Sequence, residues 1–149
     1  MSDATPAPEP RPEAVAAAGW WADALATPTR HDMGDPSADV MARKAAKLGA
    51  RTYTAGQVEA FRGALAIEIE KHLAKHSWRV EEPDWGAYSR AVAHDYRPAE
   101  VLETAAEAVG IKVTLLDLPM KTTMWINPGV VKVAAGHGVG IVTVWQRED

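Results

Sequence analysis

Two histidines one helical turn apart have the clearest chemical meaning in this sequence. His72 and His76 stand four positions apart, and Glu68 precedes His72 by another four. On a helix this spacing places three metal-capable side chains along one ridge, and a histidine pair at i and i+4 lets two imidazoles reach one ion. One hypothesis is therefore a metal-binding protein, or a metal-dependent hydrolase, with zinc or a similar divalent ion at Glu68, His72 and His76.

The same histidines also have a purely structural interpretation. An imidazole near the C-terminal end of a helix interacts favourably with the helix dipole and tolerates partial burial. The sequence has no His-Glu-x-x-His motif, and it has no cysteine that could supply a thiolate ligand. Our expectation is therefore that the protein holds no cofactor, with the metal site as the alternative. Further ligands would have to come from His31, Asp32, His94, Asp95 and His137.

A stripe of basic side chains offers a second kind of site. The stripe lies on the expected helix 36–48, opposite its apolar residues, and could contact nucleic acid phosphates or an acidic partner. Together with helix 55–76 it suggests a DNA-binding regulator. The formal net charge of −4 disfavours nucleic acid, and a charged stripe is usually only the solvated face of a helix. The stripe consists of Arg43, Lys44, Lys47 and Arg51.

Motifs for catalysis or nucleotide binding are missing. There is neither a Gly-x-Ser-x-Gly elbow nor a Gly-x4-Gly-Lys-Ser/Thr phosphate loop. The glycines from Gly136 to Gly140 precede an expected strand, whereas a dinucleotide site needs a helix at that place. The sequence thus does not decide whether the protein is an enzyme, although the missing motifs favour a protein without catalytic activity.

The hydrophobic pattern places these residues in an α+β fold. Apolar residues recur with a helical period up to Gly110, and then with a period of two. We expect about five helices packed on a three- or four-stranded antiparallel meander at the C-terminal end, because the links between the strands are short. The expected helices span 13–26, 36–48, 55–76, a segment from Pro83 to Val92, and 98–109. The expected strands span 111–116, 121–127, 130–134 and 141–146.

Two of these helices have well-defined apolar faces. In helix 55–76 the face comprises Val58, Phe61, Leu65, Ile69 and Leu73, which we expect in the core. In the helix that begins at Pro83, Trp85 and Tyr88 share one side with Val92. An exposed Trp20 would suit a binding hot spot, but for the six tryptophans the sequence favours burial in the core with one or two half-buried rings.

The chain is expected to form one domain with a short tail. Residues 1–12 alternate proline with small or charged residues, which predicts a disordered tail. Residues 13–149 then form a single α+β domain. We expect a cytoplasmic protein without membrane contact, because the N-terminus lacks a secretory signal and no apolar run approaches the roughly 20 residues of a membrane span.

One segment resembles a known group of proteins. The stretch from Met120 to Gly138, closing on Trp145, is similar to the tail of small uncharacterised proteins from actinobacteria and their phages. This resemblance implies a cytoplasmic accessory protein, encoded by a phage or a mobile element. With the missing catalytic motifs, it favours a non-enzymatic interaction or regulatory module whose partner is another protein or a second copy of itself.

Overall fold

Helices and an antiparallel sheet make up the ordered domain. The structure is a computed structural model that describes residues 9–26, 53–94, 99–113, 118, 121–135 and 140–148. Within these ranges the α+β class is confirmed. The helices are α1 (Pro12–Ala26), α3 (Ala55–Ala74), α4 (Ala87–Arg90) and α5 (Glu100–Ala108). The strands are β1 (Val92–His94), β2 (Thr122–Asn127), β3 (Val130–Ala135) and β4 (Val142–Gln146).

The four strands form one antiparallel sheet in the order β1-β2-β3-β4. The last three strands are the predicted C-terminal meander, and Gly129, with φ of 82°, supplies the left-handed residue that the turn between β2 and β3 requires. The predicted strand 111–116 is wrong over residues 111–113, and its remainder lies outside the described residues. The strand that completes the four-stranded sheet is instead β1, whose three residues are too few to reveal a strand from the sequence.

Helix α3 matches its prediction most closely. Thr54 and Gln57 form a capping box, in which the Thr54 hydroxyl accepts from the Gln57 amide at 3.0 Å and the Gln57 side chain accepts from the Thr54 amide at 2.8 Å. All five residues of the predicted apolar face are buried. Helical spacing and a polar cap thus specified this helix together.

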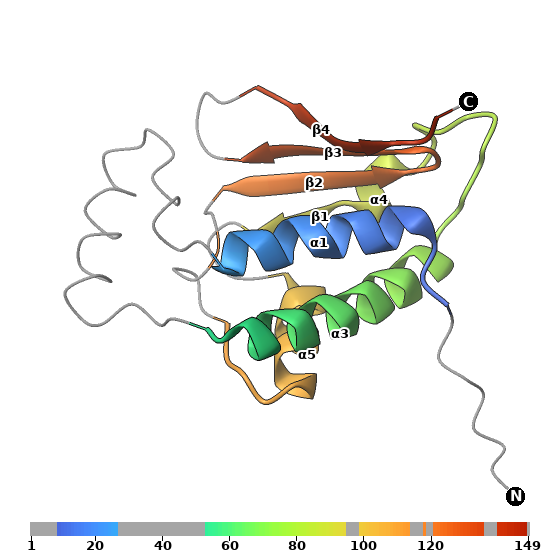
Figure 1. The fold of residues 1–149 in the computed structure, drawn as a ribbon. Coiled ribbons are helices and arrows are strands. Elements are labelled where there is room, and N and C mark those ends of the chain that lie inside the picture. Colours follow the sequence, from blue (N-terminus) through green and yellow to red (C-terminus); the bar gives the residue numbers. More distant parts are fainter. Residues whose placement is uncertain are drawn as a thin grey trace, which may run out of the picture.

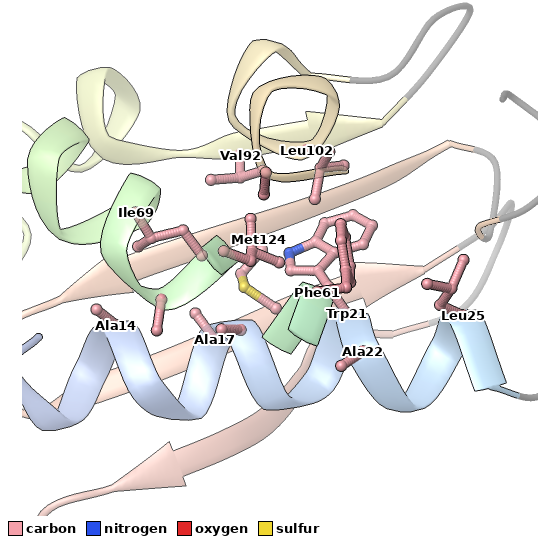
Figure 2. Packing of buried hydrophobic residues seen from close by; sticks show 14 of the residues in the cluster. Ala14, Ala17, Trp21, Ala22, Leu25, Phe61, Ile69, Val92, Leu102 and Met124 are labelled. Atoms are coloured by element: carbon pink, nitrogen blue, oxygen red, sulfur yellow. The ribbon is translucent and has the colours of Figure 1, made fainter. Parts of the chain in front are cut away.

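Helix α1 packs between the sheet and α3 (Figure 1). Trp21 is completely buried at this junction, near Phe61 of α3 and Met124 of β2 (Figure 2). Val15 of α1 is half exposed. Small side chains occupy the buried face instead, because they let the helix approach its neighbours closely. They are Ala14, Ala17, Ala18 and Ala22.

The prediction of about five helices needs correction. The described residues contain four, and the predicted helix 36–48 lies outside them. The helix expected from Pro83 to Val92 is wrong, because turns lead into the four-residue helix α4 and Val92 belongs to β1. Gly86 precedes α4 with φ of 73°, and the chain cannot continue a helix through that conformation.

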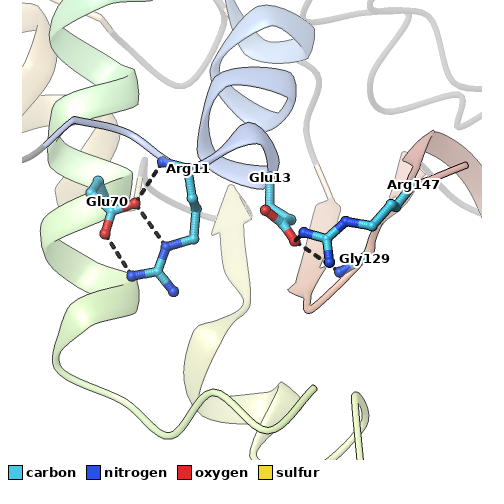
Figure 3. A network of polar contacts seen from close by, with 5 residues as sticks. All are labelled: Arg11, Glu13, Glu70, Gly129 and Arg147. Carbon is cyan, nitrogen blue, oxygen red and sulfur yellow. Dashed lines mark hydrogen bonds and ion pairs between the residues drawn. The ribbon is translucent and has the colours of Figure 1, made fainter. Parts of the chain in front are cut away.

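Two buried carboxylates fix the start of α1 to the rest of the domain (Figure 3). Glu70 of α3 accepts hydrogen bonds from the Arg11 amide, Nε and Nη2 at 2.9, 2.8 and 2.6 Å. Glu13 accepts from the Gly129 amide at 2.8 Å and from Arg147 at 3.3 Å. The hydrogen bonds from Arg11 hold the pKa of Glu70 below its ordinary value.

These contacts bear on the predicted domain limits. Arg11 and Pro12, which we assigned to the disordered tail 1–12, belong to the folded domain. Residues 1–8 lie outside the described residues, so the prediction of disorder stays a prediction for them. Among the described helices, none has the length and apolarity needed to cross a bilayer.

Candidate functional site

The histidine ridge borders a cavity of about 310 Å³ between α3 and the start of α5, with Val92 of β1 among its lining residues. Glu68 and His72 line this cavity, whereas His76, the third residue of the predicted site, is not among its lining residues. Lys71 and Lys75 of α3 and Glu100 of α5 add charges. The two negative charges of Glu68 and Glu100 balance the two positive charges of Lys71 and Lys75, so the cavity attracts neither anions nor cations strongly.

The geometry of the ridge does not assemble a metal site. The rings of His72 and His76 meet edge to face with their centroids 4.9 Å apart, and Glu68 pairs with Lys71 at 3.2 Å. Nε2 of His72 is fully buried, so it cannot reach an ion in the cavity without moving. Within the described ranges no three His, Cys, Asp or Glu residues lie close enough to hold a metal. The metal hypothesis at Glu68, His72 and His76 stays a prediction without geometric support.

His72 is instead held as a neutral side chain. Burial, and then the neighbouring His76, keep the pKa of His72 below its ordinary value, against the opposing effect of hydrogen bonding to the backbone of Arg90 and Ser89. The imidazole thus packs against the short segment that connects α4 to β1.

We expect the domain to lose stability as the pH falls below about 6.5, the ordinary value for histidine. A depressed pKa means that unfolding takes up a proton, so the contribution of neutral His72 is complete above that pH and disappears on acidification. Chemical unfolding between pH 8 and 5 would measure the dependence, and His72→Gln should flatten it. His76→Gln is the matched control: it leaves the buried imidazole in place and removes only the smaller effect of His76, so it should flatten the profile less than His72→Gln does. Identical profiles for wild type and His72→Gln would contradict this assignment.

A buried arginine organises the segment beside His72. Arg90 is completely buried, and its five N–H groups donate to five acceptors at 2.7–2.9 Å. Burial lowers the pKa of this guanidinium. Because each of its N–H groups has a hydrogen-bond acceptor, the guanidinium of Arg90 can stay charged in the interior of the domain. The acceptors are the carbonyls of Ser77, Pro83, Trp85 and Ile126, and Oδ1 of Asn127.

Large side chains on this anchored segment face the solvent. Tyr88 is 93% exposed, Val80 60% and Trp85 52%. The Arg79 guanidinium lies over the Trp85 ring at 4.3 Å. We call Arg79, Val80, Trp85 and Tyr88 the aromatic surface. Sequence reasoning placed Trp85 and Tyr88 on the inward side of a helix, because nothing in the pattern showed that Arg90 would take the interior position.

The other predicted residues are not brought to this site. The basic stripe of Arg43, Lys44, Lys47 and Arg51 lies outside the described residues, so its role in binding nucleic acid or an acidic partner stays a prediction. His94 is described, and it is buried against Trp21, with the ring centroids 6.2 Å apart. The other four possible metal ligands also lie outside the described ranges; they are His31, Asp32, Asp95 and His137.

Comparisons with known proteins identify a relationship over most of the chain. The model of the BTG family matches residues 41–145. Among solved structures, the BTG/Tob domain of FOG-3 from C. elegans is similar, with a TM-score of 0.55 and 19% sequence identity. That match covers 74% of this chain and 87% of the FOG-3 chain, and at this identity it shows the fold alone. A comparison with curated proteins finds no match.

These matches correct the resemblance drawn from the sequence. The segment from Met120 to Gly138 lies inside the BTG match, so its assignment to proteins of actinobacteria and their phages is wrong. The family match likewise contradicts the phage-like character that this resemblance implied. The segment forms β2, β3 and their turn, and such a hairpin pattern recurs in unrelated proteins.

Proposed function

Because the chain belongs to the BTG family, we propose that it is a regulatory module that binds a partner protein through the aromatic surface. Proteins with BTG/Tob domains are non-enzymatic regulators that often interact with other proteins. The proposal agrees with the interaction module expected from the sequence, and it also specifies which surface of the domain binds the partner. The observation that carries it is the exposure of Tyr88 and Trp85 on a segment held by Arg90.

The chemistry of the aromatic surface supports this proposal. Tryptophan, tyrosine and arginine are the residues most enriched at the energetic centres of protein interfaces. Leaving large aromatic rings in water is unfavourable unless a partner covers them, and each ring buries a large area on binding. The aromatic surface combines all three residue types within ten positions of the sequence.

The anchoring of the segment supports it further. The guanidinium of Arg90 binds the carbonyls of Ser77, Pro83 and Trp85, and so holds the segment from both ends. A surface that is fixed before binding loses less conformational entropy in the complex than a mobile one. The aromatic surface is thus both exposed and preorganised, which are the two properties of a docking site.

Site-specific photo-crosslinking tests the proposal. A photoreactive phenylalanine derivative would replace Tyr88 in the full chain, and the same derivative at Val15 would be the control, because Val15 is half exposed on α1 and is not part of the aromatic surface. We expect a discrete protein adduct from position 88 that disappears when Trp85→Ala is added. Adducts that form equally from positions 15 and 88, or that persist without Trp85, would contradict the proposal.

A further inference from the structure

The aromatic surface lies among negative charges. Glu81, Glu82 and Asp84 are all exposed, and Arg79 is the one cation between positions 79 and 88, so the segment carries three negative charges and one positive, a net of −2. Asp84 also acts electrostatically on the buried Arg90. A partner that covers this segment must place positive charge against it, because uncompensated carboxylates in an interface are costly.

The segment already holds one guanidinium in the way that a partner could be held. Arg79 stacks on the Trp85 ring at 4.3 Å, and its Nη1 lies 3.6 Å from the Glu82 carboxylate. A planar guanidinium can stack on a ring and pair with a carboxylate at the same time, which the ammonium of lysine does less well. The same kind of contact recurs nearby, where Arg11 lies 4.5 Å from the Trp78 ring.

Tyr88 offers a second ring for such a contact. Its side chain is almost fully exposed, and the described residues place no other ring or cation over it. Glu81 likewise makes no ion pair with any other described residue. A ring and a carboxylate are therefore both available on the surface.

We propose that the aromatic surface binds an arginine-rich segment of the partner protein, which stacks a guanidinium group on Tyr88 and pairs its positive charge with Glu81, beside the contact that Arg79 already makes with Trp85 and Glu82. This inference rests on the proposed function and names the chemistry of the partner. The rival occupant is the basic stripe around Arg43 and Lys47 in a second copy of the chain.

Binding of short synthetic peptides to the full chain tests the inference. The probes are a labelled peptide in which arginine alternates with serine, and the same peptide with lysine or glutamate in place of arginine, followed by fluorescence anisotropy. The arginine peptide should bind roughly threefold to fivefold more tightly than the lysine peptide, the gain expected from stacking at an exposed site. The glutamate peptide should not bind. Tyr88→Leu should remove most of the preference for arginine, because it removes the ring.

A matched pair of variants separates this site from general attraction to an acidic protein. Glu81→Gln with Glu82→Gln removes two charges beside the rings, and Glu103→Gln with Glu107→Gln removes two exposed charges from α5. Only the first pair should weaken the arginine peptide, and the effect should diminish as salt rises from about 50 to 300 mM. Equal weakening by both pairs, or equal affinity for arginine and lysine, would overturn the inference.

Two further outcomes distinguish its failure from that of the proposed function. If crosslinking from position 88 captures a partner that binds without an arginine-rich segment, the inference is wrong and the docking function stands. If the chain sediments as a dimer that Tyr88→Leu dissociates, and the arginine peptide does not bind, the occupant is a second copy and the inference is overturned.

Discussion

Replacing Arg90 by alanine is expected to lower the free energy of unfolding by about 3–5 kcal/mol, the range for removing one partner from a buried charged network. The change leaves five acceptors inside the fold without their donor. It also releases the segment between Ser77 and Trp85 from β2. Urea unfolding followed by circular dichroism would measure the loss, which is a large fraction of the roughly 5–15 kcal/mol that stabilises a typical domain.

Two other variants keep this prediction testable if the alanine variant does not fold. Arg90→Lys retains a charge and part of the stem, but its single ammonium cannot reach five acceptors, so an intermediate loss is expected. Arg79→Ala is the matched control from the same segment, because the ion pair of Arg79 with Glu82 is exposed and should contribute no more than about 1 kcal/mol. Equal stabilities of the Arg90 and Arg79 variants would contradict the anchoring role of Arg90.

The parts of the fold that could be predicted are those with a repeated local pattern. Helix α3 has both an apolar period and a capping box, and β2 to β4 alternate and are separated by short turns. Strand β1 could not be predicted, because three residues do not establish a period and its pairing with β2 is a long-range contact. The error at Tyr88 arises because turns and Gly86, with φ of 73°, interrupt the segment, so no single helical face runs from Trp85 to Val92.

The buried polar network was invisible in the sequence for a different reason. Arg11 and Glu70 are 59 positions apart, and Arg90 is bound mainly by backbone carbonyls, which carry no signature in the sequence. In contrast, Glu68 and His72 stand one turn apart on a single helix, and both line the cavity beside it. Spacing within a helix can show which side chains share a ridge, but not whether their nitrogen atoms face the interior or a cavity.

Truncating the aromatic surface is expected to have the largest effect on binding. Trp85→Ala and Tyr88→Ala together should weaken binding of the partner identified by crosslinking by at least about 30-fold, which is the effect of losing a single hot-spot contribution of about 2 kcal/mol. The loss should appear mainly in the dissociation rate, as is usual for contacts at the centre of an interface. The domain should stay folded with a modest loss of stability, since Tyr88 is almost fully exposed and Trp85 is half exposed.

The most direct test of the account is the affinity of that purified partner for three forms of the full chain. Wild type and Val15→Ala, which removes an exposed apolar side chain from α1, should bind equally well. The variant without the Trp85 and Tyr88 rings should bind at least about 30-fold more weakly or not at all, while it still unfolds in a single cooperative urea transition well above the conditions of the binding assay. Undiminished affinity in the doubly truncated but fully folded variant would show that the aromatic surface is not the docking site, and would contradict the central claim.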